Sequence, residues 1–204
     1  YNGSELVLVL NTTEDVELNS SRCTLTDSNE FSVVFEDDFE SYPNNSSISG
    51  VWNNFIEAGS KEWKIKTTTD SQNQGSKIAQ IGAYNSGDPS NIAWLISPPI
   101  NLDSQSIEFI NFQSSNSFSD NSNLELLIST DWNATNSGVI SATWSALPGI
   151  IVSDSESYQN WIDSSHIDLS AYSGTAFIAF KYTGGGTNNS GTFEIDNFQV
   201  ITQN

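Results

Sequence analysis

Short runs of alternating apolar and polar residues recur along most of the chain. Within 124–129 the apolar residues at 124, 126 and 128 face one way, and those at 176, 178 and 180 do the same within 176–181. One apolar face per strand implies two packed sheets, as in a sandwich or barrel. We predict strands at 31–39, 63–67, 76–82, 92–97, 106–114, 123–130, 176–183 and 192–201.

Turn residues separate these predicted strands. Pro98 and Pro99 end a strand because proline cannot donate to a sheet ladder. The glycine-rich segment 184–191 joins the last two strands through a flexible hairpin loop, since it lacks the lysine and the following helix of a phosphate-binding loop. A helix is expected only around 158–169, where a loop leading to a strand would fit equally well.

The first 31 residues differ from the rest of the chain. Residues 5–10 form an apolar run that predicts one strand, and the polar stretch after it contains the single cysteine, Cys23, as an unpaired thiol. We interpret 1–31 as an N-terminal extension or the end of a preceding module, and 32–204 as one domain. The start at Tyr1, without a basic and apolar leader, indicates a mature or excised fragment.

Composition and charge limit the class of partner. Hydrophobic residues make up 36% of the chain, enough for a core, and no apolar run approaches the roughly 20 residues of a membrane span. The 6 basic and 25 acidic residues give a net charge of −19, which would repel nucleic acid and anionic membranes. Cations and neutral ligands are the expected partners. Low lysine content and strong acidity favour a secreted or cell-surface protein, and we expect a monomer.

The sequence contains little that indicates a catalytic site. His166 is the only histidine, and its sequence neighbours Ser165 and Asp168 do not give the geometry of a catalytic triad. One histidine and one cysteine argue against a zinc site. No carboxylate pair for glycoside hydrolysis stands out among the 25 acids. We therefore predict that the protein is not an enzyme.

Two acidic, strand-like segments stand near opposite ends of the predicted domain, at 35–40 and 193–198. Terminal strands of a β-sandwich often lie side by side, so these segments could offer oxygen ligands to one hard cation such as calcium. Phe39 separates Asp38 from Glu40, which points both carboxylates to the same side of a strand, while Glu36 and Asp37 face outward. The alternative is that these acids are merely solvated.

Four segments together resemble a known family. Residues 35–40, 91–102, 124–132 and 193–200 are similar, in order and spacing, to the choice-of-anchor J and cleaved adhesin domains of secreted Bacteroidetes proteins. The resemblance covers about 32–202 and implies an all-β fold, a jelly-roll β-sandwich of two antiparallel sheets related to MAM domains and carbohydrate-binding modules. Such domains often carry calcium and are usually appended to enzymes or adhesins.

The resemblance also implies calcium ligands. Asp38 and Glu40 match acids of the family's first strand, and Asp196 matches the acid near the end of the last strand. Asp88 and Asn91 match the Asp/Asn-rich stretch that precedes the Ser-Pro segment in some adhesin repeats. We predict a structural calcium ion at these five residues.

Aromatic residues outside the predicted core are candidates for sugar binding. Trp63 and Trp94 lie in predicted strands and should be buried. Five others stand in polar surroundings, where an exposed ring could stack on a sugar: Tyr84, Trp132, Trp144, Tyr158 and Trp161.

The sequence thus predicts a non-catalytic, calcium-stabilised adhesin or carbohydrate-binding-like module of an exported multidomain protein. Its partner would be a glycan or cell-surface polymer. The competing interpretation is a structural spacer or protein-interaction domain beside a catalytic domain; a hydrolase is a more distant alternative.

Overall fold

The computed structural model describes residues 31–70, 72–105, 107–118, 120–153, 156 and 160–203. The predicted strand at 5–10, Cys23 and the rest of the predicted N-terminal extension before Phe31 lie outside the described residues.

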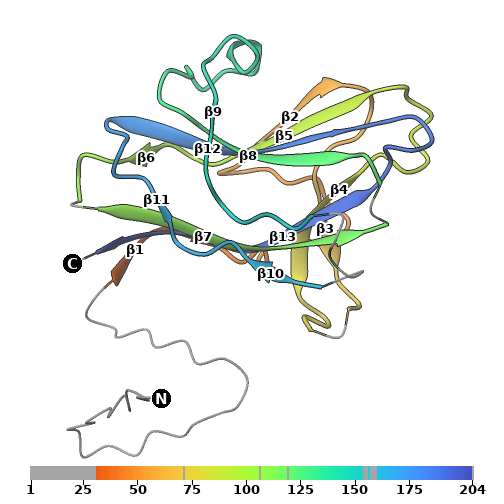
Figure 1. The fold of residues 1–204 in the computed structure, drawn as a ribbon, viewed down its shortest axis with the longest axis horizontal. Coiled ribbons are helices and arrows are strands. Elements are labelled where there is room, and N and C mark those ends of the chain that lie inside the picture. Colours follow the sequence, from red (N-terminus) through yellow and green to blue (C-terminus); the bar gives the residue numbers. More distant parts are fainter. Residues whose placement is uncertain are drawn as a thin grey trace, which may run out of the picture.

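The described strands form two antiparallel sheets that pack face to face as a jelly-roll β-sandwich (Figure 1). This confirms the predicted fold class. The first sheet contains β1 (Phe31–Asp37), β3 (Lys64–Thr67), β4 (Lys77–Gly82), β7 (Glu108–Ser117), β10 (Ile162–Asp163), β11 (Ile167–Asp168) and β13 (Thr192–Gln203). The second sheet contains β2 (Asn53–Ala58), β5 (Asn91–Ile96), β6 (Ile100–Asn101), β8 (Asn123–Ser129), β9 (Ser145–Ala146) and β12 (Thr175–Gly184).

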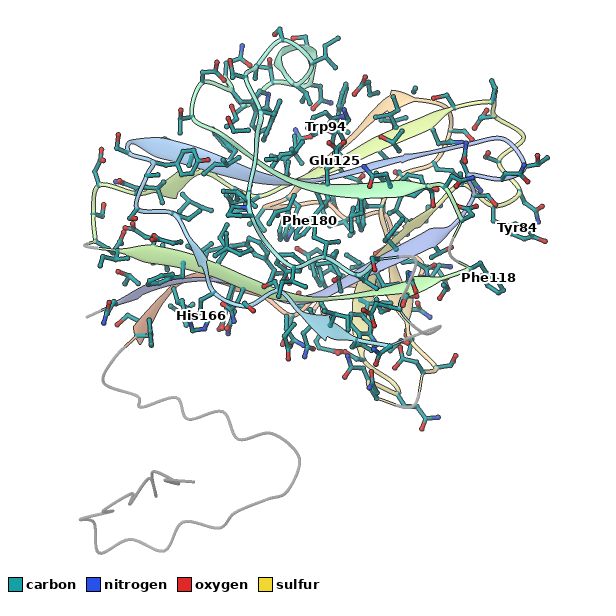
Figure 2. All side chains as sticks on the ribbon, in the orientation of Figure 1. Tyr84, Trp94, Phe118, Glu125, His166 and Phe180 are labelled. Atoms are coloured by element: carbon teal, nitrogen blue, oxygen red, sulfur yellow. The ribbon has the colours of Figure 1, made fainter. Side chains whose placement is uncertain are left out.

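The core lies between the two sheets and follows the predicted alternation. Residues 124, 126 and 128 of β8 and 176, 178 and 180 of β12 all belong to the central buried cluster. Phe180 lies at its middle, with its ring centroid 4.9 Å from that of Phe112 and 5.9 Å from that of Phe198, both in the opposite sheet (Figure 2). Trp63, as predicted, is fully buried beside Phe180.

The first and last described strands pair with each other, as predicted from their sequences. β1 runs antiparallel to β13, with Phe31 opposite Gln203 and Asp37 opposite Phe198. On its other edge β13 pairs with β7. The two ends of the domain are therefore joined by backbone hydrogen bonds between β1 and β13, with a register shift between Val33 and Phe35.

The structure differs from the expected helix, from one predicted strand end and by one strand that was not predicted. The described part of 158–169 holds the short strands β10 and β11, which pair with β7, and the helix among the described residues is one 3₁₀ turn, Asn136–Gly138. The first strand ends at Asp37 because Phe39 adopts a positive φ of 56°. The strand β2 was not predicted, because it begins with two polar residues, Asn53 and Asn54. No helix in the part of the chain that the structure describes is long and apolar enough to cross a membrane.

The central position of Phe180 generates a test of the packing. Phe180→Ala should lower the free energy of unfolding by about 3–5 kcal/mol, because it removes contacts with both sheets and leaves a cavity. Ile140→Ala is the control, since Ile140 is 66% exposed and its loss should change stability by less than about 0.5 kcal/mol. Urea unfolding of both variants measures this, and similar losses for the two would contradict the assigned core.

Candidate functional site

Three of the predicted metal ligands lie near the point where β13 changes its pairing partner, and two of them, Glu40 and Asp196, contact the same hydroxyl group. One edge of β13 pairs with β4 over 192–195 and with β1 over 198–203, so the two partners follow each other along that edge. At the change the register shifts between Asp196 and Gln199, and Asn197 has a positive φ of 51°. The turn after β1 brings Asp38 and Glu40 to this point. We call Asp38, Glu40 and Asp196 the β13 acid cluster.

Hydrogen bonds define the geometry of the cluster. The Ser76 hydroxyl lies 3.0 Å from Oε1 of Glu40 and 3.0 Å from Oδ2 of Asp196, so it links the two carboxylates. The backbone N–H of Lys77 donates to the same oxygen of Glu40 at 2.8 Å. Oδ1 of Asp38 accepts from the backbone N–H of Glu40 at 3.1 Å, which directs this exposed carboxylate onto its own turn.

Burial makes the negative charge of Asp196 costly. The side chain is 1% exposed, and burial raises the pKa of Asp196 to about 6, although hydrogen bonds from Asn197 and Ser76 favour the charged form. The negative charges of Glu40 and Asp38 raise this pKa further. The ammonium group of Lys77 donates to the backbone carbonyl of Glu40 at 2.6 Å rather than to a carboxylate of the cluster.

The chemistry of the cluster fits a hard cation in part. The carboxylates of Glu40 and Asp196 lie on either side of the Ser76 hydroxyl, and calcium takes about six to eight oxygen ligands. Within the described ranges, however, no three His, Cys, Asp or Glu side chains group closely enough to hold a metal ion. Backbone carbonyls and water would have to complete the coordination, so the calcium ion stays a prediction.

Asp88 and Asn91 do not join the β13 acid cluster. They lie near the opposite end of β4 and fasten the turn between β2 and β3 to the loop before β5. Oδ1 of Asn91 accepts from the backbone N–H groups of Ser60 and Lys61, both at 3.1 Å, and Oδ2 of Asp88 accepts from the Ser60 hydroxyl at 2.6 Å. Gly59 is required there, because a Cβ atom would stand 2.3 Å from Oδ1 of Asn91.

Asp37 was expected to face outward, which is wrong. Its Oδ2 accepts from the indole N–H of Trp52 at 2.8 Å and from the Tyr42 hydroxyl at 2.9 Å. These bonds attach the end of β1 to Trp52 and Tyr42, whose rings pack against Phe39. Sequence reasoning also missed Ser76, which carries no signal beyond its position one residue before β4. Glu36 is exposed, as expected.

The expectation that Trp132 and Trp144 are exposed is wrong. The segment between β8 and β9 folds back over the outer face of the second sheet (Figure 1). There Trp132 is buried against Phe177, with 4.7 Å between ring centroids, and half-buried Trp144 lies 5.2 Å from the ring of Trp94. Polar neighbours in the sequence concealed this second apolar cluster. Trp94 is buried, as predicted.

The remaining predicted aromatics differ in exposure. Trp161 is half-buried and its indole N–H donates to the buried Asp70 at 2.7 Å. Tyr158 lies outside the described residues. Tyr84 is 70% exposed and stands at the right-hand end of the sandwich, away from the core (Figure 2). Of the four candidates that the structure describes, Tyr84 therefore has the ring surface most open to a ligand.

Tyr84 lines a hollow between the β4–β5 loop and the β12–β13 loop. The hollow measures about 440 Å³, and we call it the loop hollow. Its other lining residues are mostly small or polar: Ala83, Asn85, Ser86, Gly87, Asp88, Pro89, Gly186, Thr187 and Ser190. Tyr84, Asn85 and Thr187 are exposed, and among the described residues the side chains of Asn85 and Thr187 make no hydrogen bond.

The backbone around the loop hollow is fixed by hydrogen bonds. The N–H of Gly186 donates to the carbonyl of Asp88 at 2.9 Å, which joins the two loops directly. Oδ2 of Asp120 accepts from the backbone N–H groups of Ser190 and Gly191, and these bonds help to lower the pKa of Asp120 although burial opposes them. The predicted hairpin loop at 184–191 is thus present and anchored. Rigid loops that present free side chains can bind a ligand with little loss of conformational entropy.

Solved structures with a similar fold include bacterial adhesin domains. The K2 cleaved adhesin domain of Lys-gingipain aligns with a TM-score of 0.56 and 14% identity, over 81% of this chain and 98% of that one. The K1 cleaved adhesin domain of Lys-gingipain from Porphyromonas gingivalis W83 aligns with a TM-score of 0.51 and 13% identity, over 81% and 96% of the two chains. An exo-β-agarase gives 0.51 and 14%, over 85% of this chain and 25% of the agarase chain.

At identities of 13–14%, these similarities show only that the folds are alike. No protein-family model and no curated protein matches the sequence. The chain has the β-sandwich fold of the cleaved adhesin domains, as its resemblance implied. Membership of the choice-of-anchor J family stays a prediction.

The buried carboxylate of Asp196 generates a pH test. Its pKa of about 6 exceeds the ordinary value of 3.8, so the folded protein holds this proton more tightly than the unfolded chain. The contribution of this proton to the free energy of unfolding is complete below about pH 4 and is lost as the pH rises through about 6. In metal-free protein the free energy of unfolding should therefore fall over this range, by up to about 3 kcal/mol from Asp196.

Asp196→Asn is the matched variant, because it removes the titrating group and keeps the shape. Other buried acids, such as Glu194, contribute in the same direction, so the difference between the two proteins isolates Asp196. Urea unfolding at several pH values measures this difference. Parallel curves for the two proteins would contradict the assignment of a costly charge to Asp196.

Proposed function

We propose that this domain is a non-catalytic binding module that holds a glycan or cell-surface polymer at the loop end of the sandwich. It would serve an exported, multidomain protein in the manner of choice-of-anchor J and cleaved adhesin domains. The main support for the proposal is the exposure of Tyr84, whose side chain is 70% exposed beside a hollow lined by two hydrogen-bonded loops. The adhesin-type fold is consistent with such a role.

The chemistry of the loop hollow suits a sugar. The face of a tyrosine ring binds the apolar C–H face of a pyranose, and burying that surface on both partners is favourable. Sugar hydroxyl groups need hydrogen-bond partners, which the Asn85 amide and the Thr187 hydroxyl can provide without breaking an existing bond. A few polar groups beside one aromatic platform are typical of small-ligand sites.

Calcium at the β13 acid cluster forms the second part of the proposal. The ion would be structural: Glu40 and Asp196 would hold it, Asp38 would add negative charge, and it would offset the burial cost of Asp196. It takes no part in ligand contact, because the cluster lies at the start of β4 and Tyr84 follows its end.

A spacer or protein-interaction domain is the second candidate function. It is favoured by the burial of Trp132 and the half-burial of Trp144, which leave little of these two predicted sugar-binding rings on the surface. A spacer would present a neighbouring domain and retain no polysaccharide.

Affinity electrophoresis and a glycan array distinguish the two functions. The wild type should be retained by at least one polysaccharide, and Tyr84→Ala should weaken that binding about tenfold or more, because a central aromatic anchor is lost. Tyr84→Phe is the control, since it keeps the ring. Both variants should melt like the wild type because the side chain is exposed. Absence of any retention would refute the binding function and leave the spacer.

A further inference from the structure

Half of the basic residues of this acidic protein line one hollow. The whole chain has 6 Lys and Arg residues against 25 acids, yet three lysines line a single hollow of about 460 Å³. These are Lys61, Lys64 and Lys66, and we call the space the lysine hollow. Glu62, Gln80 and Tyr84 line it too. The three lysines lie within a six-residue segment of the sequence, so one stretch of the chain brings them all to this hollow.

Strand geometry places the lysines on the outer face of the first sheet. In β3 the buried Ile65 points into the core, so Lys64 and Lys66 both point outward, about 7 Å apart along the strand. β3 is at the edge of the sheet, and Lys64 lies opposite Gln80 of β4. Lys61 comes from the turn just before β3. The three lysines therefore line the same hollow on the outer side of β3.

Among the described residues, the protein's own acids neutralise little of the positive charge of these lysines. The ion pair in the described part of the chain joins Lys64 to Glu62 at 3.6 Å, with side chains that are 47% and 32% exposed, so it is a weak contact in water. Lys66 donates to the amide oxygen of Asn45 at 2.5 Å, a neutral partner. The ammonium group of Lys61 has no partner among the described residues. Positive charge is thus left available at this edge.

Tyr84 joins the lysine hollow to the loop hollow, because it lines both. A sugar stacked on its ring would have Asn85 and Thr187 on one side and the lysines on the other. We propose that the ligand is an acidic glycan, whose carboxylate or sulfate groups are bound by Lys61, Lys64 and Lys66. This inference rests on the proposed function and names the chemical class of its ligand.

The net charge of −19 does not forbid such a ligand. Glu62 and Asp88 each line one of the two hollows, whereas the acids on other faces of the domain act through solvent and their repulsion is screened beyond about 8–10 Å at physiological salt. Direct contacts between ammonium groups and anionic oxygens act at hydrogen-bond distance and are stronger than neutral hydrogen bonds. Local complementarity therefore selects the ligand, while the overall charge rejects polyanions elsewhere on the surface.

Binding of three kinds of hexasaccharide tests the inference. The probes are agarose-derived (neutral), κ-carrageenan-derived (sulfated) and alginate-derived (carboxylated), measured by calorimetry on the whole chain in excess calcium. One of the two acidic probes should bind at least about tenfold more tightly than the neutral probe. The preferred acidic probe distinguishes a sulfate ligand from a carboxylate ligand.

Single charge-removing variants locate the effect. Lys61→Gln and Lys64→Gln should each weaken the acidic probe by about three- to tenfold and leave the neutral probe unchanged. Lys181→Gln is the matched control, because it makes the same charge change in the second sheet, where Lys181 lies 4.9 Å over the ring of Trp94. Melting curves check that the variants fold.

Two outcomes would overturn the inference, and they separate it from the proposed function. If all three probes bind equally, and only Tyr84→Ala weakens them, the site takes neutral sugars and the proposed function stands. If no probe binds while the protein is folded, both the acidic ligand and the glycan-binding role fail for these sugars.

Discussion

The structure depends on the way in which β13 shares one of its edges between two partners. β4 pairs with its first residues and β1 with its last, so that the beginning and the end of the domain are held by one strand. Between the two partners the ladder is interrupted, and the buried carboxylate of Asp196 lies at the interruption. A buried charge without an ion-paired cation destabilises a fold. The β13 acid cluster is thus the place where either a proton or a bound cation would offset the cost of a buried negative charge.

The same strand arrangement connects the cluster to the loop end. β4 starts beside Asp196, with Ser76 and Lys77 bonded to Glu40, and ends at Gly82, directly before the loop that carries Tyr84. Fixing the start of β4 therefore helps to fix the direction in which the loop leaves the sheet. β4 also pairs with β3, which carries Lys64 and Lys66. The short strand β4 thus connects the proposed calcium site with Tyr84 and the lysine hollow.

The sequence was sufficient where a local pattern decides the structure. Alternation at 176, 178 and 180 identified core positions, and the acids around Phe39 and Asp196 identified strands that meet. Prediction from the sequence failed where contacts between residues far apart in the chain decide the structure. Polar neighbours made Trp132 look exposed, because nothing local shows that its segment covers the second sheet. Asp88 and Asn91 looked like metal ligands, because their true partner, the turn at Ser60, is 28 residues or more away. The grouping of three lysines around Tyr84 likewise needs the fold to become visible.

Calcium titration of metal-free wild type and Asp196→Asn, followed by calorimetry and thermal unfolding, tests the role of the β13 acid cluster most directly. Our account predicts that the wild type binds one ion at the cluster, with a gain of about 2.7 kcal/mol at one hundred times the Kd and a matching rise in Tm. Asp196→Asn should be at least as stable as the wild type without metal, yet gain nothing from calcium. Wild-type protein with no heat of binding and an unchanged Tm would contradict the account.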